Sequence, residues 1–355
     1  MTLNKVALPW LILALAFLAG CSASSSHLAY VGLPQSNSVG AFRINNGSGK
    51  FTSIVGSPFL AGNSPGPVIV APSKSFLYVA NRTDDTISLF KIDGDIGSLK
   101  EITPRVNTGV APNSMVMDAD GKFLFVGNET SHSISVYSID SGSGALKEVK
   151  GSPFLTPPNP VSLAVTPSGS FLYIVNSNLQ LVFGYAVGSD GSLQSVPGSQ
   201  FAVGEGAFAI AVDPGGKFVY VANSAEDTVS IFSIASTGAL NPITDSPFPT
   251  GTTPLAIVLS TSGQYLYLAN HGSNNVTAYS IDSTSGTPTA VSGSPFSATT
   301  QAVSLAADPN GKVLYVLGQD PTISTLSITS STGALTSGTQ SATAESTPVS
   351  IFVTK

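Results

Sequence analysis

The stretch "KFVYVANSAEDTVSIFSI", Lys217 to Ile234, decides the fold, because the chain contains six versions of it. Each version places two short apolar segments on either side of a polar loop, which predicts two β-strands joined by a turn. The six apolar cores are 47 or 48 residues apart and begin at Phe76, Phe123, Phe171, Phe218, Tyr265 and Val313. A fixed period in this range indicates a repeat architecture.

Each repeat carries the signals of a four-stranded antiparallel sheet. A short apolar segment such as "AIAVD" (Ala209–Asp213) leads through a turn such as "DPGGK" into the aromatic strand, and the Gly supplies the positive φ of a tight hairpin. A third strand such as "TVSIFSI" (Thr228–Ile234) and a weaker fourth such as "LKEVKGSPF" (Leu146–Phe154) follow. Because both faces of these strands are largely apolar, we expect each sheet to pack between two others, as in a β-propeller.

The two ends of the chain complete the number of sheets. A seventh copy, "LAYVGL" (Leu28–Leu33), begins at the aromatic strand and lacks a first strand. The last segment, "VSIFVT" (Val349–Thr354), has the pattern of a first strand with nothing after it. We therefore predict an all-β, seven-bladed β-propeller with four-stranded antiparallel blades over residues 28–355. In this fold the C-terminal strand closes the first blade and removes the exposed sheet edges.

The first residues are similar to a bacterial lipoprotein signal. Lys5 precedes the apolar segment Val6–Phe17, which is short for a membrane span, and the segment runs into "LAGC", which ends at Cys21. The resemblance implies a signal peptide over residues 1–20, followed by a lipidated Cys21 and a flexible tether over residues 21–27. We expect an exported protein held in the bacterial envelope, at the outer membrane, by its lipid anchor. An ordinary cleaved signal is the alternative.

Composition restricts the partners and cofactors. The chain has 14 Lys+Arg against 20 Asp+Glu and a formal net charge of −6, which argues against binding to nucleic acid. Cys21 is the only cysteine, so the fold must be held by core burial without a disulfide. The three histidines form no metal-ligand motif, and we find neither a Gly-rich phosphate loop nor a Ser nucleophile elbow. We expect a monomer without metal or cofactor.

The repeats resemble those of a known group. "LYVAN…DTISLFKID" and its copies are similar to the repeats of the lactonase-like seven-bladed propellers, which include propeller-type 6-phosphogluconolactonases. "YVAN" followed by "DTVS" also resembles the YVTN repeat of bacterial and archaeal surface proteins. The resemblance covers nearly the whole chain after the signal. It implies a site at the mouth of the central channel, where lactone hydrolysis needs a base for water and a donor for the oxyanion.

The loops at that mouth contain the candidate site residues. The predicted catalytic residues are Arg82, Glu129, His132 and His271. The predicted ligand-binding residues are Glu205, Asn113 and Asn159, the last two lying where members of the group often carry His. For each residue the alternative is an ordinary solvated loop side chain.

Two functions remain open at this point. We favour a binding or scaffold module of the cell envelope that holds a small molecule, a sugar or a protein at the channel mouth. The alternative is a hydrolase that opens a sugar or related lactone, as in 6-phosphogluconolactonase chemistry. Five aromatic strands end in Asn, and for these residues we predict a structural role at the strand end rather than a polar ring around a ligand.

Overall fold

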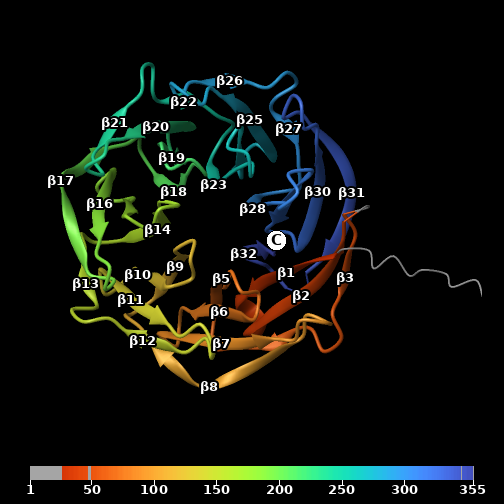
Figure 1. The fold of residues 1–355 in the computed structure, drawn as a ribbon. Helices are drawn as coiled ribbons and strands as arrows, with labels where there is room; N and C mark the ends of the chain where they lie inside the picture. Colours follow the sequence, from red (N-terminus) through yellow and green to blue (C-terminus); the bar gives the residue numbers. More distant parts are fainter. Residues whose placement is uncertain (1–25, 47–48, 345, 355) are drawn as a thin grey trace, which may run out of the picture.

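Seven antiparallel sheets surround a central channel in the computed structural model, which describes residues 26–46, 49–344 and 346–354 (Figure 1). The prediction of an all-β, seven-bladed propeller is confirmed: the only helix in the described residues is the short 3-10 helix η1 (Pro34–Ser36). No helix in those ranges is long and apolar enough to cross a membrane. The predicted signal peptide and Cys21 lie outside the described residues.

We number the blades 1 to 7 by their aromatic strands, and the strands of each blade follow from the channel to the rim. Blade 1 contains β32 (Ser350–Val353), β1 (Ser26–Leu33), β2 (Ser38–Asn45), β3 (Phe51–Ser53) and β4 (Phe59–Leu60), and blade 2 contains β5 (Pro65–Val70), β6 (Phe76–Asn81), β7 (Thr86–Ile92) and β8 (Leu99–Asn107). Blade 3 contains β9 (Pro112–Met117), β10 (Phe123–Asn128), β11 (Ser133–Ile139), β12 (Leu146–Glu148) and β13 (Phe154–Leu155), and blade 4 contains β14 (Pro160–Val165), β15 (Phe171–Asn176), β16 (Leu181–Val187) and β17 (Leu193–Ala202). Blade 5 contains β18 (Ala207–Val212), β19 (Phe218–Asn223), β20 (Thr228–Ile234), β21 (Leu240–Pro242) and β22 (Phe248–Pro249), and blade 6 contains β23 (Pro254–Leu259), β24 (Tyr265–Asn270), β25 (Asn275–Ile281), β26 (Pro288–Ala290) and β27 (Phe296–Ser297). Blade 7 contains β28 (Ala302–Ala307), β29 (Val313–Gly318), β30 (Thr322–Ile328) and β31 (Leu335–Thr343).

The core is divided among the contacts between neighbouring blades. Seven clusters of buried apolar side chains are present, and each cluster draws its residues from two adjacent blades. The aromatic strands lie at the centre of this packing, since all six residues of β6, β10, β19 and β24 are buried. The apolar repeat therefore stabilises the ring because each blade buries both faces against its neighbours.

Blade 1 is closed by the two ends of the chain, as the sequence predicts. β32 pairs with β1 in antiparallel register from Ala29 opposite Val353 to Gly32 opposite Ser350. Two further hydrogen bonds join Leu28 to Thr354: the Leu28 N–H donates to Oγ1 at 3.0 Å, and the Thr354 N–H donates to the Leu28 carbonyl at 2.9 Å. β32 also contacts β5 and β28, so the first strands form a continuous inner ring (Figure 1).

The outer strand is interrupted in four of the blades, where the sequence pattern predicts a single strand. In blade 3 the ladder stops at Glu148 and resumes at Phe154. Between these points the Ser152 hydroxyl accepts the Val136 N–H of the third strand at 2.9 Å, so a side chain takes the place of a backbone acceptor of the outer strand. The serines of the other "SPF" copies do the same in blades 1, 5 and 6. Phe154 then rejoins the blade by pairing with Ile134.

The asparagines that end the aromatic strands have the predicted structural role. Asn81 is fully buried, and its Oδ1 accepts the Gly62 N–H at 3.0 Å. Its Nδ2 donates to the hydroxyls of Thr86 and Ser88, at 3.1 and 3.0 Å, on the next strand. The same donor pattern recurs in blades 3, 5 and 6. The Asn81 amide thus ties together three segments of its own blade, whereas the Oδ1 atoms of Asn223 and Asn270 are buried without a hydrogen-bond partner in the described residues.

Candidate functional site

The channel mouth is formed where the first strands begin and the aromatic strands end. In blade 5, Ala207 pairs with Asn223 and Ala209 pairs with Ala222, so Phe208 is the extra residue of a β-bulge. The same irregularity occurs at the start of the first strand in other blades, and the extra residues there are Asn113, Val161, Leu255 and Val303. A bulge redirects a side chain away from the regular alternation of the sheet. It presents one variable residue from each of these blades at the mouth.

A second set of variable residues follows the aromatic strands directly. The Arg82 N–H donates to the Ser64 carbonyl at 3.0 Å, and the Glu129 N–H donates to the Ala111 carbonyl at 3.0 Å. Both acceptors have a positive φ, 55° at Ser64 and 57° at Ala111, which turns each loop into its first strand. Because this turn is repeated, Arg82 and Glu129 occupy equivalent positions in blades 2 and 3. The same position holds His271 in blade 6, where the backbone acceptor is Thr253 at 2.9 Å.

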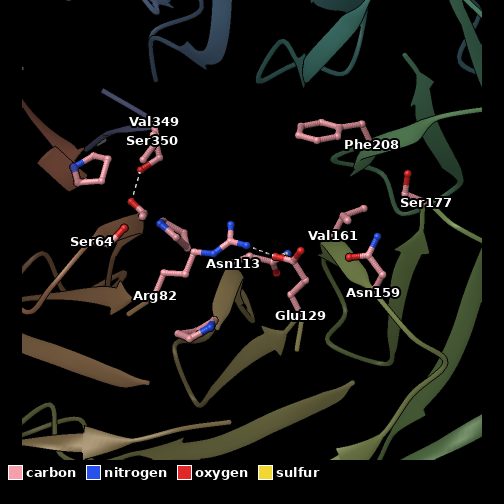
Figure 2. A pocket seen from close by; sticks show the side chains of 14 residues that line it. Ser64, Arg82, Asn113, Glu129, Asn159, Val161, Ser177, Phe208, Val349 and Ser350 are labelled. Atoms are coloured by element: carbon pink, nitrogen blue, oxygen red, sulfur yellow. Dashed lines mark hydrogen bonds and ion pairs between the residues drawn. The ribbon is translucent and has the colours of Figure 1, made fainter. Parts of the chain in front are cut away.

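These positions surround a cavity of about 560 Å³ at the mouth (Figure 2). Its lining consists of Pro34, Ser64, Gly66, Pro67, Arg82, Pro112, Asn113, Glu129, Asn159, Val161, Ser177, Phe208, Val349 and Ser350. Four of the residues predicted from the sequence, Arg82, Asn113, Glu129 and Asn159, are thus brought together. The cavity extends over blades 1 to 5 and not over the whole ring.

Glu129 is the centre of the polar contacts in the cavity. Its Oε2 accepts hydrogen bonds from the Arg82 guanidinium at 2.6 Å and from the Asn113 Nδ2 at 3.3 Å (Figure 2). The Glu129 side chain is 29% exposed and the Arg82 side chain 51% exposed. Within the described chain the second carboxylate oxygen, Oε1, accepts no hydrogen bond. Glu129 is therefore held in place through one oxygen, and the other oxygen is free to interact with a bound molecule.

His132 lies in the turn after the aromatic strand and does not line the cavity. Its φ is 51°, and the equivalent turn residues Asp85 and Asp227 have φ of 55° and 58°. The side chains of these aspartates accept a backbone N–H of the next blade, from Ala111 and Thr253, both at 2.8 Å. The Nδ1 of His132 is similarly 3.3 Å from the Asn159 N–H, and it is 2.8 Å from the Glu129 carbonyl. His132 thus occupies a position that joins neighbouring blades.

His271 and Glu205 also lie away from the cavity. His271 is half-buried in blade 6, and its Nδ1 is buried without a hydrogen-bond partner in the described residues. Glu205 is exposed in the loop before blade 5. His271 occupies in blade 6 the position that Arg82 and Glu129 occupy in blades 2 and 3, so it lies at the channel mouth. The cavity extends only over blades 1 to 5 and does not reach His271. Consequently the two predicted histidines do not converge with Arg82 and Glu129 on one site.

Several lining residues were not predicted from the sequence. Phe208 and Val349 contribute apolar surface, and Ser64, Ser177 and Ser350 contribute hydroxyls (Figure 2). The Ser350 hydroxyl donates to the Gly66 carbonyl at 2.7 Å, which fixes its orientation. The signal for these residues is their place in the repeat: each precedes or begins a first strand or follows an aromatic strand.

A second cavity, of about 580 Å³, lies at the opposite end of the channel. Its walls include Val70, Pro309 and Phe352, and Lys74 is its only charged lining residue. None of the predicted site residues reaches it. No group of three or more His, Cys, Asp or Glu side chains in the described ranges could hold a metal ion at either end.

Comparisons with known proteins agree with this architecture. The profile of a family described as "Lactonase, 7-bladed beta-propeller" matches residues 20–163 and 158–353. Among solved structures, a candidate 6-phosphogluconolactonase of Bacteroides fragilis is 23% identical, with a TM-score of 0.80 over 94% of this chain and 99% of that one. The periplasmic gluconolactonase PpgL of Pseudomonas aeruginosa is 20% identical, with a TM-score of 0.78 over 93% and 99% of the two chains. At these identities the structures show a shared fold, which does not by itself carry an activity. No curated protein sequence matches the chain.

Proposed function

The chain belongs to the family of seven-bladed lactonase β-propellers, and from this premise we propose that it is a hydrolase that opens a sugar-type lactone in the cavity at the channel mouth. The observation that carries the proposal is the arrangement at Glu129, whose Oε2 is held by Arg82 and Asn113 while Oε1 faces no protein donor. Such a cavity offers a carboxylate base and a guanidinium donor side by side, which is what ester hydrolysis requires.

The reaction uses these groups in defined roles. Oε1 of Glu129 accepts a proton from a water molecule as the water oxygen attacks the carbonyl carbon of the lactone. The N–H groups of Arg82 that do not contact Glu129 stabilise the negative charge on the former carbonyl oxygen. When the ring C–O bond breaks, the departing oxygen takes the proton from Glu129. The products are one hydroxyl group and one carboxylic acid, and the carboxylate of Glu129 is restored.

The family match favours this hydrolase over the binding or scaffold module that the sequence patterns alone place first. The match extends over residues 20–353, and this range contains nearly all of the described residues that form the ring and its mouth. A ligand-binding role without turnover is the outcome that the experiment below distinguishes.

The test is a panel of five- and six-membered sugar lactones with the purified chain, following acid release above the spontaneous rate. We expect turnover by the unaltered protein, and a fall in kcat/KM of about 10²-fold or more in Glu129→Gln, because general base catalysis is typically worth that factor. Arg82→Gln should lose about 10²-fold, the usual cost of one oxyanion donor. Without turnover of any lactone in the panel, the hydrolase proposal fails.

A matched control is available on the outer strand of blade 2. Arg105 and Glu101 form an ion pair there with an Nε–Oε1 distance of 2.7 Å. Glu101→Gln therefore makes the same chemical change and breaks the same kind of pair outside the cavity. An equal loss of turnover in Glu101→Gln would show that the effect of Glu129→Gln is structural.

We also propose that the protein is exported and anchored through acyl chains on Cys21, in the outer membrane of the bacterial envelope. The support is the order of signals in the sequence: a positive residue, an apolar segment of twelve residues from Val6 to Phe17, and "LAGC". Metabolic labelling with a radioactive fatty acid should mark the unaltered chain in membranes and should not mark Cys21→Ser. Labelling that persists in Cys21→Ser would contradict this proposal.

A further inference from the structure

Phe208 is a large aromatic side chain that stands partly free on the wall of the cavity. It is 43% exposed, whereas its neighbour Ala207 is fully buried. The bulge explains the difference, because Phe208 is the unpaired extra residue between two residues that pair with β19. Figure 2 shows its ring on the side of the cavity opposite Ser64. An apolar ring exposed in this way is available for stacking on a ligand.

The other blades show that an aromatic residue is not required by the architecture. The extra residue of the bulge is Asn113 in blade 3, Val161 in blade 4 and Leu255 in blade 6. Asn113 and Val161 line the cavity and Leu255 does not. Phe208 is therefore the one aromatic residue among the described lining residues. The pairing of β18 with β19 does not require an aromatic side chain at this position, so the ring of Phe208 is available to the cavity.

The charges that face the cavity are already paired with each other. Arg82 and Glu129 are the only charged residues in its lining, and they form a direct ion pair. The remaining arginine of blade 2, Arg105, is bound to Glu101 at 2.7 Å and lies 3.6 Å from Asp84. A phosphate dianion at the remaining N–H groups of Arg82 would lie beside the Glu129 carboxylate, and the two anions would compete for a single guanidinium. The cavity lacks the cluster of cations that recognises phosphate.

Neutral hydrogen-bonding groups complete the lining. Asn159 is held by Asn178, its Nδ2 lying 3.3 Å from the Asn178 Oδ1. The hydroxyls of Ser64 and Ser177 make no hydrogen bond to the described residues and can both donate and accept. A few polar groups around an apolar wall are typical of a site that fixes the orientation of a small ligand. These groups match the hydroxyls of a sugar ring, whose C–H face can lie on an aromatic ring.

From these features we infer that the cavity selects an uncharged, polyhydroxylated lactone stacked on Phe208, and that it discriminates against the phosphate monoester of the same ring. This inference rests on the proposed function, since it names the substrate class of that site. Phe208 is a specificity-determining residue that touches the ring of the substrate. Arg82 and Glu129 remain the pair that performs the chemistry.

The test measures binding without turnover. Glucono-δ-lactam, which the site cannot hydrolyse as a lactone, and its 6-phosphate are titrated calorimetrically into the unaltered chain, Phe208→Ala, Phe208→Leu and Leu255→Ala. We expect the neutral lactam to bind at least tenfold more tightly than its phosphate. Phe208→Ala should weaken the neutral lactam about tenfold, Phe208→Leu should weaken it less, and Leu255→Ala should leave it within twofold.

The outcomes separate this inference from the proposed function. A phosphate that binds as tightly as the neutral ring, a Phe208→Ala variant with unchanged affinity, or no binding of the neutral lactam would each overturn the inference, even if lactone turnover depends on Glu129. Conversely, Phe208-dependent binding of the neutral lactam without turnover of any lactone would support the inference and reject the hydrolase.

Discussion

The hydroxyl of Tyr78 donates a hydrogen bond to the carbonyl oxygen of Gly144, 66 residues later and one blade away, at 2.8 Å. Three more blades repeat this bond between a tyrosine of the aromatic strand and the glycine of a turn in the next blade: Tyr30 to Gly97, Tyr173 to Gly238, and Tyr267 to Gly333. Blade 3 carries Phe125 at the equivalent position and lacks the hydroxyl. The ring is thus joined by a repeated polar contact as well as by its apolar core.

Phe125→Tyr should stabilise the protein. The added hydroxyl would reach toward the carbonyl of Gly191, the turn glycine of blade 4, and a buried hydrogen bond contributes about 1 kcal/mol net. Denaturant unfolding should therefore give a higher midpoint with an unchanged slope. A lower midpoint would mean that this contact between blades has no room for the oxygen.

Tyr78→Phe should destabilise the protein by about 1–2 kcal/mol, because it removes the donor and leaves the Gly144 carbonyl without its partner. Tyr220→Phe is the matched control. Its hydroxyl is buried and has no hydrogen-bond partner in the described residues, so its removal should be neutral or stabilising. If both substitutions cost the same in thermal or denaturant unfolding, the hydrogen bond is not the source of the effect.

Deletion of Val349 to Lys355 should destabilise the whole ring. The deletion removes β32, exposes the edge of β1, and takes Ile351 and Phe352 out of the two clusters that flank blade 1. Ile351→Ala alone should cost about 2–4 kcal/mol, the usual range for a buried large-to-small change. The deletion should destabilise the protein by more than Ile351→Ala does, and this loss should be measured as a lower melting temperature. A melting temperature equal to that of the full chain would contradict closure by β32.

Stability should fall as the pH rises above 10. Burial raises the pKa of nine of the ten tyrosines above the ordinary value of 10.0, and the rise is largest for Tyr30, Tyr78, Tyr173, Tyr220, Tyr267 and Tyr315. The unfolded chain loses these protons near pH 10 and the folded chain retains them. The contribution of these tyrosines to the free energy of unfolding is therefore complete below pH 10, and it is lost as the pH rises toward their pKa values in the folded protein.

The measurement for this prediction is a spectrophotometric titration of tyrosinate together with circular dichroism. The six tyrosines with the largest rise in pKa should ionise only as the sheet signal disappears. Ionisation of all ten near pH 10 with the sheet signal intact would contradict the burial of these side chains.

The fold could be predicted from the sequence because every signal in the repeat agrees with the others. The 47- or 48-residue period, the apolar strands and the incomplete first and last copies all require a ring of seven closed by the C-terminal strand. The interruption of the outer strand could not be predicted in the same way. It depends on a serine hydroxyl, such as that of Ser152, which accepts the Val136 N–H of the third strand in place of a backbone carbonyl.

The candidate site was predictable only in part. Arg82, Glu129, Asn113 and Asn159 were found because polar residues in the mouth loops stand out in an apolar repeat. His132 lies in a turn with a positive φ, and its ring contacts the backbone of the next blade at Asn159. The residue type alone does not reveal this position. Phe208 was missed because an aromatic residue in an apolar strand has the pattern of a core residue. Only the bulge turns it toward the cavity.

Both ends of the described chain lie on the face opposite the cavity. β1 runs from Ser26 to Leu33, and Pro34 then reaches the mouth, while Thr354 returns to Leu28 at the other end of the same blade. At about 3.3 Å per residue, eight residues of strand separate the two faces by roughly 25 Å. A surface that holds the protein by its N-terminal side would thus meet the face that carries the second cavity, and the mouth with Arg82 and Glu129 would face away from that surface.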